Sequence, residues 1–101
     1  MVKHIVCFKL IKDDIKEREK AKEVLLSMKG NVPMLRGIKV NIDELRTNRS
    51  FDVILETLLD DFVALEEYQK DAYHCDVVKK HMHAVAEKSI SMDYQIEKED
   101  F

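Results

Sequence analysis

Tyr68 and His74, six residues apart, are the residues of this sequence best suited to acid–base chemistry. An imidazole titrates near neutral pH and can take up or release a proton during a reaction. A phenol beside it could hydrogen-bond to a carbonyl or to an oxyanion. A third candidate is His4, which lies in an otherwise apolar segment near the start of the chain. We interpret Tyr68, His74 and His4 as candidate catalytic residues of a small-molecule site.

The same three residues also have a purely structural interpretation. His74 would then bond to a nearby backbone carbonyl at a helix start, and Tyr68 would belong to the core. His4 would be a satisfied core or interface group, as a single imidazole on an apolar strand usually is. Spacing alone favours this structural interpretation, so the sequence leaves both open.

Apolar residues around His74 recur at helical spacing and therefore share one face of a predicted helix. One side of the first strand is also apolar. We expect these two surfaces to enclose a pocket for a small apolar, carbonyl-bearing or phenolic ligand. Its candidate ligand-binding residues are Val6 and Phe8 on the strand, and Val77, Val78 and His81 on the helix.

The sequence predicts no metal and no cofactor. His74 and His81 would lie about 10 Å apart along a helix axis, too far to share one ion. His81 and His83 diverge on a helix, and no glycine-rich phosphate loop, serine nucleophile motif or paired-cysteine motif is present. The two cysteines, Cys7 and Cys75, are too few for a disulfide framework.

The first strand, residues 2–11, has no polar face. Successive side chains of a strand point to opposite sides, and here both sides carry large apolar residues. Helices of the same chain can cover one side. Because a chain this short has little left to cover the other, we expect a second copy of the chain to do so.

The remaining periodicity predicts a β-α-β-β-α-β order, which is the ferredoxin-like arrangement of the α+β class with a four-stranded antiparallel sheet. Strands are expected over residues 2–11, 36–46, 50–58 and 89–97. Helices are expected from Asp13 or Asp14 to about Lys29, from Asp60 or Asp61 to about Lys70, and from His74 to about Glu87. Residues 1–97 would form one domain, followed by a charged tail, residues 98–101.

Composition excludes several classes of protein. The 101 residues include 17 basic and 20 acidic ones, for a net charge of −3, which argues against a nucleic-acid partner. No run approaches the ~20 apolar residues of a membrane span. No signal peptide is evident, so we expect a cytoplasmic protein.

Several segments together resemble the stress-responsive α/β-barrel family, the Dabb domain. They span nearly the whole chain in order: residues 2–6 with Phe8-Lys9, Val32-Pro33, residues 50–53, residues 65–69 followed by His74, and Met92-Asp93-Tyr94. The resemblance implies a ferredoxin-like protomer and a homodimer whose two sheets form a barrel.

Functionally the resemblance implies less, because most members of the family lack a defined activity. One plant branch contains a polyketide cyclase, and the resemblance would place its acid–base pair at Tyr68 and His74 and another pocket histidine at His4. Two features depart from the pattern. The cyclase has a further pocket histidine on the third strand, where this chain has Asp52, and the family usually has a His-Pro pair where this chain has Asp71-Ala72. The resemblance therefore implies a pocket without implying the cyclase reaction.

Three hypotheses follow. The first is a small-molecule-binding homodimer, with or without proton transfer. The second is a stress-associated structural dimer, which predicts no pocket as large as the ~300 Å³ typical of ligand sites. The third is a small cofactor-free monooxygenase or cyclase-like enzyme.

Overall fold

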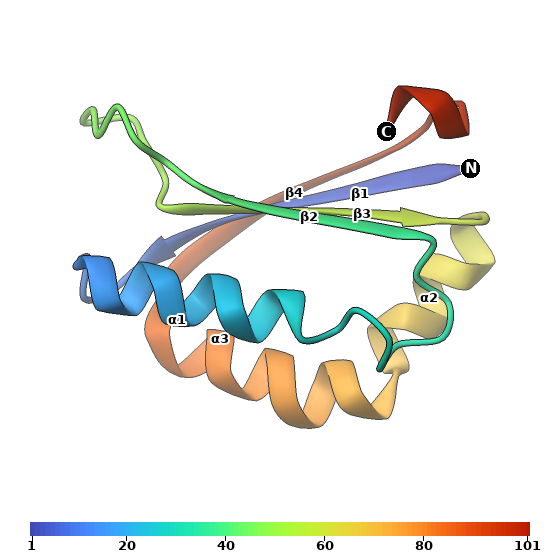
Figure 1. Cartoon of the computed structure of the whole chain (residues 1–101), viewed down its shortest axis with the longest axis horizontal. Helices are drawn as coiled ribbons and strands as arrows, with labels where there is room; N and C mark the ends of the chain where they lie inside the picture. Colours follow the sequence, from blue (N-terminus) through green and yellow to red (C-terminus); the bar gives the residue numbers. More distant parts are fainter.

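A computed structural model describes all 101 residues of the chain. Four strands form one antiparallel sheet in the order β2-β3-β1-β4 (Figure 1). The strands are β1 (Val2–Leu10), β2 (Gly37–Ile42), β3 (Val53–Leu59) and β4 (Ala86–Gln95). The helical segments are α1 (Ile15–Leu26), α2 (Phe62–Lys70), the π-helix η1 (His74–Lys79), α3 (Lys80–Val85) and a 3-10 turn η2 (Lys98–Asp100). The predicted β-α-β-β-α-β order is confirmed.

Aspartates begin the two main helices. The Asp14 carboxylate accepts the backbone N–H of Glu17 at 2.9 Å, and the Asp61 carboxylate accepts that of Ala64 at 2.8 Å. These bonds satisfy amide groups that have no partner inside a helix. No helix combines the length and the apolar character needed to cross a bilayer.

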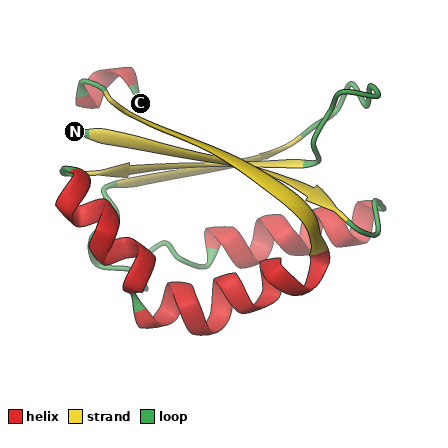
Figure 2. Ribbon diagram, turned by 180° about the vertical axis from the view of Figure 1, so that it is seen from behind, coloured by secondary structure: helices red, strands yellow, loops and turns green.

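All three α-helices cover the same face of the sheet (Figure 2). On this inner face, His4 of β1 stands opposite Thr57 of β3 and Asp93 of β4, because directly paired residues of antiparallel strands share a face. The core between helices and sheet contains twelve buried residues: Leu10, Ala21, Leu25, Met28, Val32, Val40, Val53, Leu55, Leu59, Tyr68, Val78 and Met82. The pocket candidates on β1 therefore face the helices.

The outer face of the sheet carries an apolar surface on β1 and β4 that none of the α-helices covers. Ile5 and Cys7 of β1 are half-buried and lie beside Met92 and Ile90 of β4. Met92 and Ile90 are 67% and 58% exposed, and Tyr94 on the same face is 39% exposed. The prediction that β1 has two apolar sides, of which the chain's own helices cover one, is confirmed.

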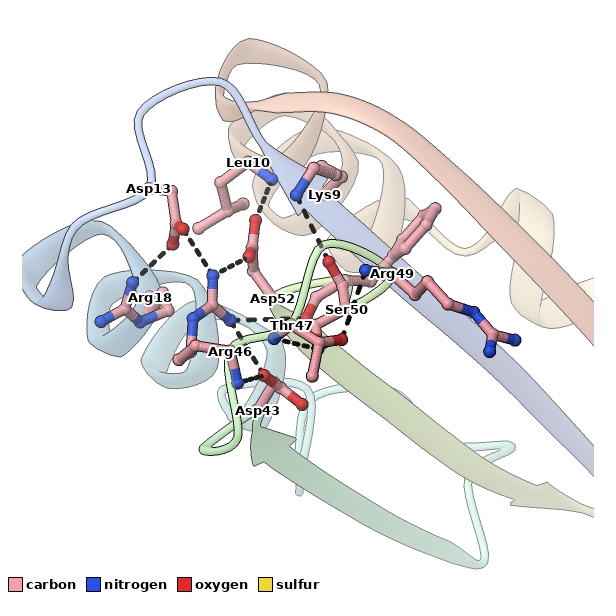
Figure 3. A network of polar contacts seen from close by, with 11 residues as sticks. Lys9, Leu10, Asp13, Arg18, Asp43, Arg46, Thr47, Arg49, Ser50 and Asp52 are labelled. Carbon is pink, nitrogen blue, oxygen red and sulfur yellow. Dashed lines mark hydrogen bonds and ion pairs between the residues drawn. The ribbon is translucent and has the colours of Figure 1, made fainter.

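The predicted strands 36–46 and 50–58 differ from the structure at the hairpin between β2 and β3. The first prediction extends past the end of β2, and the second begins before β3. β2 ends at Ile42 and β3 begins at Val53 because the segment between them forms a polar network (Figure 3). Arg46, in the left-handed backbone conformation with a φ of 58°, contacts the carboxylates of Asp13, Asp43 and Asp52.

Two other predicted boundaries also differ. The first helix ends at Leu26 instead of Lys29, and turns continue to Gly30, whose φ of +83° favours glycine. The helix predicted over 74–87 is divided into η1 and α3, and β4 begins at Ala86 instead of residue 89.

The last residues fold back onto the outer face of the sheet. The Phe101 ring packs against Gly37 so closely that a Cβ atom there would lie 2.9 Å from it. The ammonium groups of Lys39 and Lys3 lie 4.5 and 5.7 Å from the centre of the same ring. Glycine at position 37 is therefore what allows Phe101 to cover this end of β2.

Candidate functional site

A cavity of about 420 Å³ lies between the inner face of β1 and β4 and the helical segments α2, η1 and α3. Its apolar walls are formed by Val6, Phe8, Leu25, Leu55, Val78 and Met82. Exposed polar residues of α3 and β4 also line it, among them Lys88, Ser89 and Ser91. β4 is an edge strand, so a ligand could enter beside it without any strand separating.

His74 is held at the base of this cavity by the end of α2. Its backbone N–H donates to the Asp71 carboxylate at 3.0 Å, and its ring Nδ1–H donates to the Tyr68 carbonyl at 2.8 Å. A carbonyl can only accept, so the bond fixes the tautomer in which Nε2 carries the lone pair. Nε2 has no protein partner and is not shielded from the cavity.

Burial lowers the pKa of His74 below its ordinary value of 6.5, and the bond to the Tyr68 carbonyl offsets this only in part. The charge of Lys79 lowers it further. A charged imidazole loses more solvation than a neutral one when it is buried, so the neutral form is favoured here. His74 is therefore neutral at pH 7 and presents Nε2 as a hydrogen-bond acceptor.

Tyr68 lies between the two histidines. Its ring stacks on His74 with centroids 4.0 Å apart, and meets the His4 ring edge-on at 5.8 Å. Its hydroxyl donates to the Met28 sulfur at 3.6 Å, away from both imidazoles, and burial raises its pKa well above the usual range. Tyr68 and His74 are thus stacked instead of hydrogen-bonded through their side chains.

His4 has a partner that sequence reasoning missed. Its Nδ1–H donates to the Asp93 carboxylate across the β1–β4 pairing, and its Nε2 has no protein partner. The His4 side chain is 6% exposed and that of Asp93 is 34% exposed. The signal was available in the alternation of β4, which places Asp93 on the opposite side from Met92 and Tyr94.

The cavity includes some of the predicted ligand-binding residues and not others. Val6, Phe8 and Val78 line it, whereas Val77 is 43% exposed and His81 lies outside the lining. Val77 and Val78 belong to η1, in which backbone bonds run from i to i+5, so a face drawn at α-helical spacing does not stay together there. The His81 Nε2 atom is buried without a hydrogen-bond partner.

The residues that depart from the cyclase pattern have structural partners. Asp52 lies away from the cavity, where its carboxylate accepts the Leu10 amide at 2.6 Å and pairs with Arg46 at 2.6 Å. The Asp71 carboxylate accepts the backbone N–H of His74. No group of three or more histidine, cysteine or acidic side chains lies close enough together to hold a metal ion.

The fold is ferredoxin-like, with a cavity between the sheet and its helices, and comparison with known proteins identifies the family. The model of the stress responsive A/B barrel domain, Dabb, matches residues 2–96. The chain therefore belongs to the Dabb family. A search of curated proteins found no match.

Solved structures share the fold at low sequence identity. A dimeric protein of unknown function from Bacteroides fragilis has a TM-score of 0.77 and 20% identity, covering 94% of this chain and 95% of its own. The protein At3g17210 from Arabidopsis thaliana has a TM-score of 0.81 and 17% identity, covering 97% of each chain. A hydroxynitrile lyase from Passiflora edulis has a TM-score of 0.77 and 16% identity, covering 96% of this chain and 94% of its own.

Proposed function

We propose that this Dabb-family chain binds a small, largely apolar ligand bearing a carbonyl or phenol group, and transfers a proton on it without a cofactor. The observation that carries the proposal is the placement of two imidazoles, His4 and His74, beside one cavity of about 420 Å³. Both have Nδ1 committed to a protein acceptor and Nε2 free. Neither Nε2 atom has a protein partner and neither is sealed from the cavity, so both can accept a hydrogen bond or a proton from a ligand.

The two imidazoles are suited to different tasks. His4 is backed by a carboxylate, which stabilises the positive charge that forms on the ring when Nε2 accepts a proton. His74 is backed only by a backbone carbonyl and is kept neutral by burial. We therefore assign His4 as the general base, Asp93 as its positioning residue, and His74 as the acceptor that orients a ligand hydroxyl. Tyr68 supplies the aromatic wall between them.

The apolar outer face supports a homodimer. Exposed side chains of β4 and half-buried ones of β1 form a continuous apolar surface on that face, of the kind that marks protein interfaces. The Bacteroides fragilis protein and a second neighbour, from Thermobifida fusca, are described as dimeric. We propose that two copies of this chain pack sheet against sheet and so form the barrel.

Comparison of volumes favours ligand binding over a purely structural role. The structural hypothesis requires a site smaller than the ~300 Å³ of typical ligand pockets, and the cavity is larger. The likeness to a hydroxynitrile lyase adds support, because such an enzyme must move a proton to or from a hydroxyl group.

Deuterium exchange can test proton transfer without knowledge of the natural substrate. The probe is 4-hydroxyacetophenone in D₂O, whose methyl protons exchange when a base removes one and the enol is quenched with a deuteron. We expect the chain to accelerate this exchange, His4→Gln to abolish the acceleration, and Asp93→Asn to reduce it about 10-fold or more, as loss of a residue that orients a histidine commonly does.

Asp76→Asn is the matched control, since Asp76 is exposed and lies outside the cavity. Imidazole ¹⁵N shifts measured with the same probe report binding independently of exchange. Exchange that continues unchanged in His4→Gln would refute the assignment of the base. Absence of any shift of His4 and His74 at millimolar probe would refute the ligand-binding site.

A further inference from the structure

One ammonium group reaches the cavity from the last residue of η1. Lys79 lines the cavity and is half-buried, and its Nζ donates to the Gln69 carbonyl at 2.8 Å. Gln69 is the next-to-last residue of α2, where helix carbonyls lack partners within the helix and carry partial negative charge. The carbonyl therefore holds the ammonium in one place, and two of its three N–H groups stay free.

Lys79 has no carboxylate partner, although the chain as a whole is acidic. The chain carries a net charge of −3 and makes ten close ion pairs, yet Lys79 takes part in none of them. Among the residues lining the cavity, Lys79 and Lys88 are basic and only Glu87 is acidic. The Lys88 ammonium lies 5.7 Å from the centre of the Phe51 ring, which is not part of the lining, so Lys79 is the ammonium best placed to meet a ligand.

We propose that Lys79 binds an acidic group of the ligand, so that the ligand is a small organic acid with an apolar body and a carbonyl or hydroxyl group at its other end. This inference rests on the proposed function, and it narrows the class of ligand from neutral carbonyl compounds and phenols to carboxylates. Hydrogen bonds between a charged donor and a charged acceptor are about twice as strong as neutral ones, and a half-buried site screens them less than open water does.

The position of Lys79 couples this anchor to His74. Four groups act on the His74 imidazole: Lys79 of its own helix, His4 of β1, and Tyr68 and Asp71 at the end of α2. Burial is the main reason that the pKa of His74 is low, and the charge of Lys79 adds to the lowering. A bound carboxylate would neutralise that charge and raise the pKa of His74, whereas an uncharged ligand of the same shape would not.

A purely structural alternative makes a different prediction. Lys79 could serve only to cap the carbonyl of Gln69, and its removal would then loosen the end of α2 and weaken every ligand equally. Binding of a charged and an uncharged ligand of nearly the same shape separates the two roles.

The test uses 4-acetylbenzoate and 4-acetylbenzamide, whose acetyl groups are identical and whose other ends differ in charge. We expect the chain to bind the acid about 10-fold more tightly than the amide at low salt, as a charge-assisted hydrogen bond allows. Lys79→Met should remove this preference by weakening the acid alone, and Lys79→Arg should keep most of it. The control is Lys80→Met, since Lys80 is exposed and outside the cavity.

Titration of the His74 ¹⁵N signals supplies a second measurement. Its pKa should rise when the acid binds and also in free Lys79→Met, and it should not rise with the amide. Equal affinities for the acid and the amide in the unmodified chain, or an equal loss of both in Lys79→Met, would overturn the inference while leaving the proposed function in place. Failure of both compounds to bind would overturn the two together.

Discussion

At the scale of single residues, Asp52 is a buried carboxylate that connects separate segments of the chain. Its side chain is fully buried, and each carboxylate oxygen has one partner, the Leu10 amide or the Arg46 guanidinium. The same guanidinium reaches Asp13 ahead of α1 and Asp43 at the end of β2 (Figure 3). One arginine thus joins three segments, and this explains why a residue other than glycine occupies the left-handed conformation at position 46.

Replacing Asp52 should therefore destabilise the fold strongly. We expect Asp52→Ala to lower the free energy of unfolding by about 3 kcal/mol, because it leaves the Leu10 amide and the Arg46 charge without their buried partner. Asp52→Asn retains a carbonyl for the amide and should cost less. Denaturant unfolding measures both effects.

Asp60→Ala is the appropriate control, because Asp60 also pairs with an arginine, Arg36, but in an exposed position. Its loss should change the midpoint little, as is usual for ion pairs on the surface. A similar midpoint for Asp52→Ala and Asp60→Ala would show that the network around Arg46 contributes no special stability.

At the scale of elements, the spacing of apolar residues predicted the features of the fold that depend on side-chain burial. It did not predict the features that depend on polar contacts between distant residues. Local pattern predicted the order of strands and helices and the two apolar sides of β1. It left each helix cap open between two neighbouring aspartates, of which Asp14 and Asp61 form the caps. The end of β2 does not, because it depends on an arginine that finds partners distant in the sequence. His4, Tyr68 and His74 were recognised by type, whereas Asp93 needed the register between β1 and β4.

The π-helix was also beyond the sequence pattern, since apolar spacing at i, i+3 and i+4 fits an α-helix equally well. Its wider turn carries one extra residue. From this segment the side chains of His74, Cys75 and Lys79 reach the Tyr68 and Gln69 carbonyls at the end of α2. The irregular turn thus lines the cavity, and many π-bulges occur at functional sites.

Deleting Asp76 should convert η1 into ordinary α-helix and turn His74 by about 100° relative to Val78, which is one residue of helical rotation. We expect the chain to keep its helix and strand content, and to lose both the His74–Tyr68 bond and the exchange activity. Circular dichroism measures the helix and strand content, and the ¹⁵N signals of His74 report whether its tautomer, and so its bond to Tyr68, is retained. Asp76→Ala keeps the residue count and should behave like the unmodified chain. An unchanged His74 tautomer in the deletion would show that η1 does not position this ring.

At the scale of the whole molecule, the sheet separates two surfaces with different tasks. The α-helices lie on one side of the sheet (Figure 2). The cavity is on that side, and the exposed apolar residues of β4 are on the other. Burying Ile90, Met92 and Tyr94 against a second copy would remove large exposed side chains from water at about 25 cal/mol for each Å² of apolar area.

The dimer can be tested by charge substitution on this surface. We expect the unmodified chain to scatter light as a dimer, and Ile90→Glu combined with Met92→Glu to yield folded monomers, because like charges would meet across the interface. Val63→Glu is the control, since Val63 is 65% exposed on α2, on the opposite side of the sheet. A folded single copy of the unmodified chain at micromolar concentration would contradict the barrel.

β4 serves both surfaces at once: Ser89, Ser91 and Asp93 turn toward the cavity, while the residues between them turn outward. If association of two subunits restricts the motion of this edge strand, it would also fix the position of the Asp93 carboxylate that bonds to His4. By reciprocity, any ligand that prefers the assembled state must strengthen assembly by the same factor. The apparent affinity for the ligand would then rise with protein concentration. Dilution of the unmodified chain would by itself weaken ligand binding.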